Sequence, residues 1–251
     1  MPSSVVAAVI TAAGSSRRMS GKKKEYCDLP PAFENGETLT VLGAAAKAFA
    51  SCPQIGPIVI TIPQGEESAA LACLPLELRS CENRIVFVTG GPTRRASVHN
   101  ALLKLKERNV THVLIHDGAR PWVKVNLIER IITAVMLHGA VIPALALTET
   151  PKELDGALNA ELATEKNGDV RFIRRHLKRT ELCAAQTPQG FKFSGILAAH
   201  EKAALKEEAA RKIGQVIEYT DDAEVWGEFA GQVAVIPGDS ENRKITYPED
   251  I

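Results

Sequence analysis

The sequence lacks the features that mark membrane proteins and disulfide-rich secreted proteins. No apolar run approaches the ~18 residues of a membrane-spanning helix, and the chain enters an apolar stretch near its N-terminus with no signal or transit pattern. Its five cysteines are odd in number, scattered, and form no C-x-x-C pair, which is typical of reduced thiols. We therefore expect a cytoplasmic protein that does not bind membranes.

The chain also lacks an excess of charge of either sign. Its 30 basic and 30 acidic residues cancel, so no global basic field favours nucleic acid as a partner. Hydrophobic residues make up 45% and charged residues 24% of the 251 positions, which is ordinary for a globular enzyme that buries a large core. We expect one domain over residues 1–251.

Two common glycine fingerprints for nucleotides are missing. A short apolar run at 5–10, typical of a buried strand, leads into a loop that contains Gly14 and Gly21. Their spacing fits neither the G-x-G-x-x-G of a dinucleotide site nor the G-x-x-x-x-G-K-[ST] of a P-loop. The absence of the first pattern disfavours a nicotinamide-dependent oxidoreductase.

This loop instead contains small residues followed by cations. Residues 12–16 are Ala, Ala, Gly, Ser and Ser, and five of the next eight positions are basic. The basic residues are Arg17, Arg18, Lys22, Lys23 and Lys24. Small residues let the backbone approach a ligand closely, and successive N–H groups can form an anion nest. The pattern favours polyphosphate binding over the plain alternative, a solvated basic loop.

Strand and helix patterns alternate over the first 146 residues. The expected strands cover 5–10, 58–62, 85–88, 113–115 and 140–146, and the expected helices cover 39–50, part of 65–78, 95–106 and 125–138. Such alternation predicts an α/β fold with a mainly parallel sheet and helices on both faces. The basic loop, Gly90-Gly91 and His116-Asp117 would then meet at the carboxyl ends of the strands, where such folds bind ligands.

The alternation stops at a polar excursion over residues 147–182. This segment carries charged clusters and one weak candidate strand at 170–173 that nothing nearby in the sequence would bury. We interpret it as a long loop or as an arm that pairs with a second subunit, because an isolated two-stranded ribbon is marginal in water. Beyond it, the sequence predicts a helix at 194–212, a strand at 216–219, a helix at 222–229 and a strand at 233–236.

Six ordered segments resemble one enzyme family. They are Ala12-Ala13-Gly14…Arg18-Met19…Lys24-Glu25-Tyr26, Gly90-Gly91…Arg94…Ser97-Val98, His116-Asp117-Gly118-Ala119-Arg120-Pro121, Thr187-Pro188-Gln189-Gly190-Phe191, Thr220-Asp221-Asp222-Ala223 and Lys244-Ile245-Thr246…Pro248-Glu249-Asp250. The set resembles the 2-C-methyl-D-erythritol 4-phosphate cytidylyltransferases, nucleotidyltransferases of non-mevalonate isoprenoid synthesis. The resemblance runs from about residue 5 to the last residue. It implies a Rossmann-like nucleotidyltransferase fold with a protruding β-arm for dimerisation.

The resemblance also implies a reaction, in which the phosphate of methylerythritol phosphate attacks CTP and displaces diphosphate, with Mg²⁺ as cofactor. It implies catalytic roles for Arg18 and Lys24 at the triphosphate, and for Arg179 and Lys244 at the polyol phosphate. The implied nucleotide contacts are Ala12, Ala13, Gly14, Gly91 and Ser97, and the implied polyol phosphate contacts are Asp117, Arg120, Thr150 and Thr220. Mg²⁺ would be held mainly by the CTP phosphates, with Asp117 as a candidate protein ligand.

The chain departs from the family pattern beside the expected catalytic lysine. Lys23-Lys24-Glu25 stands where the family usually has Pro-Lys-Gln, in a loop that looks one residue shorter. The choice among Lys22, Lys23 and Lys24 is therefore open, although the position of Tyr26 favours Lys24.

Two related functions fit the same segments. One is ribitol-5-phosphate cytidylyltransferase, which would apply the same chemistry to another polyol. The other is a nucleotide-binding regulator that has lost turnover, but retention of the cations expected at the reacting end argues against it. We further expect a homodimer in which the arm carries Arg179 and Thr150 to the active site of the partner.

Overall fold

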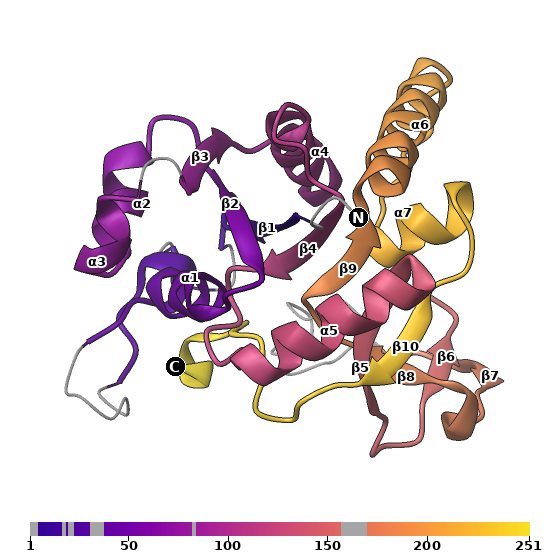
Figure 1. The fold of residues 1–251 in the computed structure, drawn as a ribbon. Helices are drawn as coiled ribbons and strands as arrows, with labels where there is room; N and C mark the ends of the chain where they lie inside the picture. The colour runs from indigo at the N-terminus through magenta and orange to yellow at the C-terminus, as the bar shows by residue number, and fades with distance from the viewer. Residues whose placement is uncertain (1–4, 17–18, 20–22, 31–37, 82–83, 157–169) are drawn as a thin grey trace.

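A mixed β-sheet forms the frame of the molecule (Figure 1). The computed structural model describes residues 5–16, 19, 23–30, 38–81, 84–156 and 170–251. Within these residues, eight strands form one sheet in the order β10-β5-β9-β4-β1-β2-β3, and β8 also pairs with β5. The strands are β1 (Val6–Thr11), β2 (Ile55–Ile62), β3 (Ile85–Thr89), β4 (His112–Asp117), β5 (Ala140–Ala146), β8 (Cys183–Ala185), β9 (Gln189–Lys192) and β10 (Ala234–Pro237). The neighbouring strands β4, β1, β2 and β3 pair in parallel, and β5 pairs in parallel with β10. This pairing confirms the expected mainly parallel sheet.

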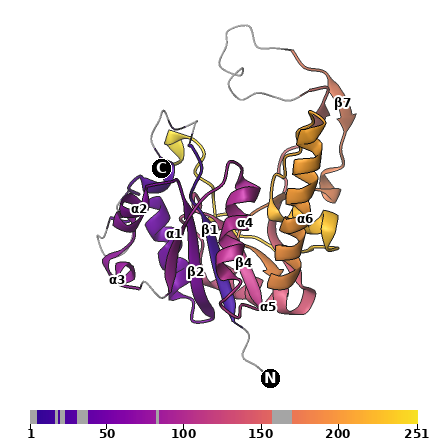
Figure 2. The ribbon, with the colours of Figure 1, turned by 90° about the horizontal axis from the view of Figure 1, so that it is seen from above.

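Helices cover both faces of this sheet, as the sequence predicts. They are α1 (Val41–Ser51), α2 (Glu67–Cys73), α3 (Leu76–Arg79), α4 (Arg94–Leu105), α5 (Val125–His138), α6 (Phe193–Lys212) and α7 (Asp222–Phe229). In β1, Ala8 and Ile10 pack with α1 and α5, whereas Ala7 and Val9 pack with α4, α6 and α7. Successive side chains of a strand point to opposite faces, and Figure 2 shows α1 and α4 on opposite sides of β1. The continuous apolar run of β1 thus reflects burial on both faces.

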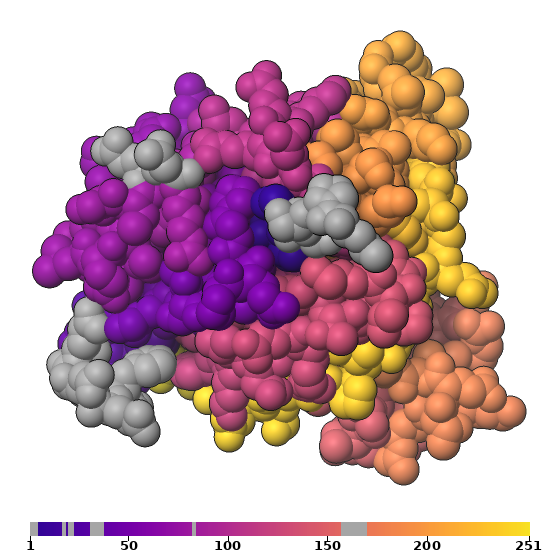
Figure 3. All heavy atoms as spheres, in the orientation of Figure 1, coloured from indigo at the N-terminus to yellow at the C-terminus, as the bar shows by residue number. Residues whose placement is uncertain are grey.

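Helix α6 extends beyond the body of the molecule. It has 20 residues, and its distal half stands out at the upper right of the space-filling view (Figure 3). Leu205 and Ile213 are exposed there. No helix in the part of the chain that the structure describes is long and apolar enough to cross a membrane.

Two segments differ from the sequence-based expectation. Strand β9, which the sequence did not predict, runs antiparallel between β4 and β5. A Cβ on its Gly190 would lie 2.9 Å from the side chain of Ile131, so glycine allows α5 to pack on this strand. Residues 216–219, expected as a strand, form none, and Val216 is 92% exposed. The prediction was wrong because β-branched residues favour a strand only where a sheet surface receives them.

The described parts of the excursion over residues 147–182 form a ribbon outside the main sheet. Strands β6 (Lys152–Leu154) and β7 (Ile173–His176) pair antiparallel, and a 3-10 helix (Arg179–Glu181) follows. The expected strand at 170–173 was therefore placed too early, since β7 begins at its last residue. Figure 2 shows β7 beyond α6, on the side away from α1. Val170 and Phe172, which precede β7, are 78% and 70% exposed.

Candidate active site

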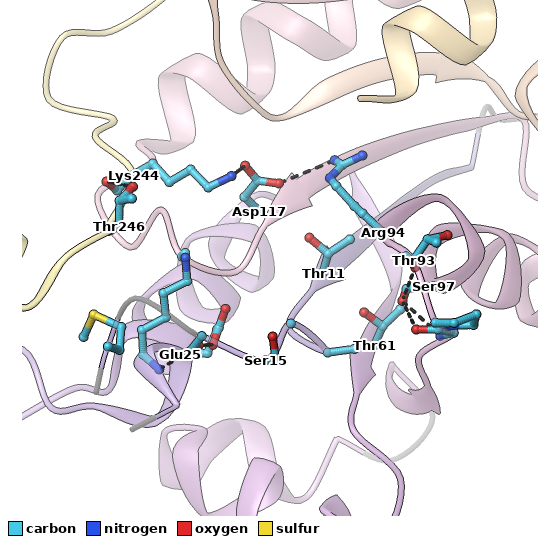
Figure 4. Close-up of a pocket in the computed structure, with 18 of the residues that line it drawn as sticks. Thr11, Ser15, Glu25, Thr61, Thr93, Arg94, Ser97, Asp117, Lys244 and Thr246 are labelled. Carbon is cyan, nitrogen blue, oxygen red and sulfur yellow. Dashed lines mark hydrogen bonds and ion pairs between the residues drawn. The ribbon is translucent and has the colours of Figure 1, made fainter. Parts of the chain in front are cut away.

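A cleft of about 640 Å³ opens at the carboxyl ends of the central strands (Figure 4). Its walls come from the loop after β1, the start of α4, the end of β4 and the segment around Lys244. These segments lie far apart in the sequence, and the parallel sheet brings them to one edge, as expected. The expected site residues that line the cleft are Ala13, Gly14, Lys24, Gly91, Ser97, Asp117 and Lys244.

Hydrogen bonds fix the backbone of the loop after β1. The Ala12 N–H donates to Thr61 O at 2.9 Å, and Ala12 is fully buried next to the cleft wall. Ser16 takes the left-handed backbone conformation, with φ 47°, which is uncommon for a residue other than glycine. Its hydroxyl donates to Glu25 Oε2 at 3.1 Å and accepts from the Lys24 N–H at 3.2 Å. These two bonds hold the loop against the segment that follows it.

Two lysines that follow this loop point in different directions. Lys24 lines the cleft, and its ammonium group donates to Ile245 O at 3.0 Å. The side chain of Lys23 is only 14% exposed and donates instead to Gly14 O at 3.0 Å. The geometry therefore favours Lys24 over Lys23 as the lysine that meets a ligand in the cleft.

The turn before α4 forms the opposite wall of the cleft. The Ser97 hydroxyl accepts from the Gly91 N–H at 3.0 Å and donates to Thr93 O at 2.9 Å, so it ties the turn to the helix. A hydroxyl oxygen has two lone pairs, and one of them stays available to a ligand. A Cβ on Gly90 would lie 2.3 Å from Ala13 Cβ. Glycine at position 90 therefore allows the two loops to meet.

Asp117, at the end of β4, is surrounded by cations. Its Oδ2 lies 2.9 Å from Lys244 Nζ and 3.7 Å from Arg120 Nε, and its Oδ1 lies 3.4 Å from Arg94 Nη2. Figure 4 shows Lys244 and Arg94 approaching the carboxylate from opposite sides. Burial alone would raise the pKa of Asp117, but Arg94 and Lys244 hold that pKa well below its usual range. The carboxylate is therefore ionised and can orient both cations.

Arg94 is a residue of the cleft for which the sequence suggested no role. Its Nη1 lies 2.7 Å from Asp222 Oδ2, and it lines the cleft beside Asp117. Asp222 is 1% exposed, and its other oxygen lies 3.2 Å from His200 Nε2. Burial would lower the pKa of Arg94, but Asp222 and Asp117 raise it above its usual value. Arg94 and Asp222 both belong to the six segments that resemble the enzyme family, but nothing in the sequence indicates that their side chains contact each other.

Besides Arg120, three expected substrate contacts do not line this cleft. Thr220 is exposed, and its hydroxyl donates to Glu224 Oε2 at 2.8 Å. Thr150 and Arg179 are exposed in the ribbon segment, where Arg179 donates to Thr148 O at 2.6 Å. Their roles at a substrate phosphate stay predictions.

Arg120 does not line the cleft but contacts Asp117, which does. Its Nη1 donates to Asn242 O at 2.8 Å while its Nε faces Asp117, so it ties the end of β4 to the C-terminal segment. Burial lowers the pKa of Arg120, and Asp117 opposes that effect. Arg18 and Lys22, two cations expected near the triphosphate, lie outside the described residues.

The described residues include no group of three or more His, Cys, Asp or Glu side chains that could hold a metal ion. Asp117, the expected candidate ligand, has both of its oxygens facing cations. A metal ion at those oxygens would meet like charge at close range. The geometry therefore disfavours Asp117 as a magnesium ligand.

Comparison with known proteins gives this site a family. The sequence profile described as "IspD: 2-C-methyl-D-erythritol 4-phosphate cytidylyltransferase" matches residues 6–251. The chain belongs to the IspD family. The 2-C-methyl-D-erythritol 4-phosphate cytidylyltransferase of Geobacillus thermodenitrificans (strain NG80-2) is 32% identical over 245 residues, which cover 97% of this chain and 92% of the relative.

Other relatives of this IspD chain are longer. The bifunctional enzyme IspD/IspF of Brucella abortus biovar 1 (strain 9-941) is 36% identical over 215 residues, which cover 84% of this chain and 48% of the relative. The chain thus spans about half the length of such bifunctional relatives. The crystal structure of the cytidylyltransferase from Thermus thermophilus matches with a TM-score of 0.67 at 27% identity, over 98% of this chain and 95% of that chain. These similarities confirm the expected Rossmann-like nucleotidyltransferase fold.

Proposed function

We propose that this IspD chain transfers CMP from CTP to 2-C-methyl-D-erythritol 4-phosphate in non-mevalonate isoprenoid synthesis. The observation that carries the proposal is the meeting of Lys24, Arg94 and Lys244 around a cleft bounded by two loops of small residues. A triphosphate and a second phosphate bring several negative charges into one place. A cluster of fixed cations offsets such charge.

The proposed reaction is an in-line displacement at phosphorus. An oxygen of methylerythritol phosphate forms a bond to the α-phosphorus of CTP. The bond from that phosphorus to the bridging oxygen breaks, and its electron pair leaves with diphosphate, giving 4-diphosphocytidyl-2-C-methyl-D-erythritol. The step needs no covalent enzyme intermediate, so the protein contributes position and charge.

We assign Lys24 and Lys244 to the two reacting phosphates. Lys24, together with Arg18, would offset the charge that develops on the triphosphate. Lys244, held 2.9 Å from Asp117, would position the polyol phosphate for attack. Arg94 contacts the other oxygen of the same carboxylate at 3.4 Å, so the orientation of the carboxylate is fixed. The carboxylate can then hold the Lys244 ammonium group in place before the substrate arrives. Charge that is organised in advance is most effective at lowering a barrier.

We assign the base and ribose to the wall formed by residues 12–14, Gly91 and Ser97. The close approach of Ala13 and Gly90 leaves less room for a purine than for a pyrimidine, which supports selection by size. The remaining lone pair of the Ser97 hydroxyl suits an amino donor such as that of cytosine.

We propose that Mg²⁺ enters this site with the triphosphate. The ion commonly keeps several waters and is held by one or two carboxylates plus substrate phosphates. The described residues suit an ion held mainly by the phosphates, because Asp117 is already engaged by cations. When bound, Mg²⁺ would offset phosphate charge.

We also propose that the working form is a homodimer with shared sites. Val170, Phe172 and Ile173 are exposed by 50–78% in the ribbon segment. A second copy packed on this ribbon would remove their apolar surface from water. It would also carry Thr150 and Arg179, which do not line the cleft of their own chain, to the substrate phosphate of the partner.

The cysteines support a cytoplasmic location. All five lie in the described residues, and none of them forms a disulfide there. Free thiols are usual in the reducing cytoplasm, where disulfides are rare.

Release of diphosphate tests the proposed function directly. The chain is given CTP, UTP, ATP or GTP with Mg²⁺ and either methylerythritol phosphate or ribitol 5-phosphate. We expect CTP with methylerythritol phosphate to react fastest, the purine nucleotides to react in trace amounts, and Lys244→Ala to lose turnover. Equal turnover of CTP and GTP would contradict the assignment as a cytidylyltransferase, but the chain would still be a nucleotidyltransferase. Faster reaction of ribitol 5-phosphate would assign the chain to the sister reaction, and CTP binding without release would indicate a regulator.

A further inference from the structure

A lysine–glutamate pair lies largely buried beside the loop after β1. The side chains of Lys23 and Glu25 are 14% and 4% exposed, and Lys23 Nζ lies 3.8 Å from Glu25 Oε2. The same ammonium group lies 5.1 Å from the centre of the Tyr26 ring, within the range of a cation–π contact. Burial lowers the pKa of Lys23, and Glu25 opposes that shift. Two charges removed from water in this way are costly unless further groups engage them.

Each member of the pair reaches back to the loop. Lys23 donates to Gly14 O at 3.0 Å. Glu25 accepts from the Ser16 hydroxyl at 3.1 Å, and that hydroxyl also accepts from the Lys24 N–H at 3.2 Å. The pair therefore holds the loop at Gly14 and at Ser16. Through the Ser16 hydroxyl it also fixes the backbone of Lys24, the lysine that lines the cleft.

Two features of the loop require such support. Ser16 has φ 47°, a conformation that costs free energy and persists only where surrounding groups hold it. Glu25 lines the cleft, where its negative charge would repel a phosphate-bearing ligand. The ammonium group of Lys23 offsets that charge at 3.8 Å.

We propose that Lys23 and Glu25 are positioning residues that hold residues 14–16 of this loop in the shape that receives the nucleotide, with Lys23 also neutralising Glu25. The proposal rests on the proposed function for the identity of the ligand, CTP. It predicts an asymmetry between variants. Loss of Lys23 alone leaves an uncompensated carboxylate in the cleft wall, whereas loss of both charges leaves a neutral loop that is only held more weakly.

The test compares Lys23→Met, Glu25→Gln and the double variant with the wild-type chain. The matched control is Lys212→Met, which removes a lysine paired at 2.8 Å with Glu208 on an exposed part of α6. The measurements are the Kd for CTP and CMP, kcat and KM, and hydrogen exchange of the amides of residues 14–16 and 24 without nucleotide. Exchange reports local opening of the backbone directly.

We expect Lys23→Met to raise the Kd and KM for CTP by about 10-fold to 10²-fold, the scale on which misplaced contacts weaken a site. The change in kcat should be smaller. The Kd for CMP should rise less than that for CTP, because CMP has fewer phosphates for Glu25 to repel. The double variant should recover part of the CTP affinity, both Lys23→Met and Glu25→Gln should speed loop exchange, and the control should change nothing.

Wild-type CTP affinity and wild-type loop exchange in Lys23→Met would overturn the proposal. So would a double variant that binds CTP no better than Lys23→Met. If Lys23→Met fails to fold, Glu25→Gln decides, because unchanged exchange around Ser16 in that variant also contradicts the pair's role. Failure of the proposed function gives a different result, because the wild-type chain then releases no diphosphate from CTP. The hydrogen-exchange comparison needs no nucleotide, so it still shows whether Lys23 and Glu25 hold the loop.

Discussion

The carboxylate of Asp117 and the ammonium group of Lys244 lie 2.9 Å apart, although they belong to distant parts of the chain. Strand β4 carries the carboxylate. The segment that carries the ammonium group is anchored beside it, because the Ile245 N–H donates to Ala119 O at 2.8 Å. The pair therefore places a fixed positive charge in the cleft, and it depends on the C-terminal segment staying docked on the sheet.

Replacing Asp117 by asparagine tests whether this orientation matters. Asp117→Asn should lower kcat/KM for methylerythritol phosphate by about 10²-fold, because Lys244 and Arg94 lose their common partner. Loss of a negative charge would by itself favour anion binding, so a fall in kcat/KM isolates the orienting effect. Steady-state kinetics with varied polyol phosphate measure it. A kcat/KM equal to or above the wild-type value would show that Lys244 needs no such partner.

Lys24 should act mainly in the transition state. Lys24→Ala should lower kcat by about 10²-fold or more and raise the Kd for CTP far less, because its charge is best matched when the triphosphate is breaking. Turnover and CTP titration on the same preparation give both quantities. Lys22→Ala is the companion variant. An unchanged rate in Lys24→Ala together with a collapse in Lys22→Ala would show that the register of the loop is wrong.

Replacing Arg94 should lower the stability of the fold. Arg94→Met leaves Asp117 and Asp222 without the guanidinium group between them, so we expect a loss of about 3–5 kcal/mol in the free energy of unfolding. Adding Asp222→Asn should restore part of it, since one stranded charge is then removed. Urea unfolding of the single and double variants measures both effects. A single variant as stable as the wild-type chain would mean that water already screens these carboxylates.

His116 should make the protein less stable below neutral pH. The Thr187 hydroxyl accepts from the Asp117 N–H at 3.0 Å and therefore directs its own proton to His116 Nδ1 at 3.1 Å, while Nε2 donates to Arg120 O at 3.1 Å. This network fits a neutral ring, and burial lowers the pKa of His116 to about 4. The unfolded chain takes up this proton near pH ~6.5, so stability falls as the pH drops from there toward the folded pKa and levels off below it.

Unfolding at two pH values measures this effect. The lowered pKa of His116 corresponds to a loss of about 2 kcal/mol in the free energy of unfolding between about pH 7 and about pH 5. His116→Gln has no ring to protonate and should lose correspondingly less over the same interval, whatever its stability at neutral pH. Equal losses in the two chains would assign the acid sensitivity to other groups.

The parts of the fold that follow local periodicity were predictable from the sequence. Helix α5 has the expected bounds, Val125–His138, because its apolar stripe recurs at helical spacing. Strand β9 was missed because it is four residues long, contains Gly190 and is flanked by partners far away in the sequence. A strand defined by its neighbours leaves little local pattern.

The site shows the same division. Lys24, Asp117 and Lys244 were identified through segments that resemble a known family, and the cleft brings them together. The contact of Arg94 with Asp222 joins two such segments at 2.7 Å, but only the folded sheet and its helices make them neighbours. Sequence motifs therefore identified residues, whereas the structure identified which residues act on one another.

A homodimer with shared sites predicts complementation between two inactive subunits. Lys24 lines the cleft of its own chain, whereas Arg179 is exposed in the ribbon segment. Lys24→Ala and Arg179→Ala homodimers should each be nearly inactive. In a mixed dimer, one site would hold both lesions and the other neither, so about half of the activity of a wild-type dimer should return. Diphosphate release, measured on heterodimers purified through two different tags, tests this. If heterodimers form and activity stays absent, Arg179 works within its own chain and the shared-site proposal is wrong.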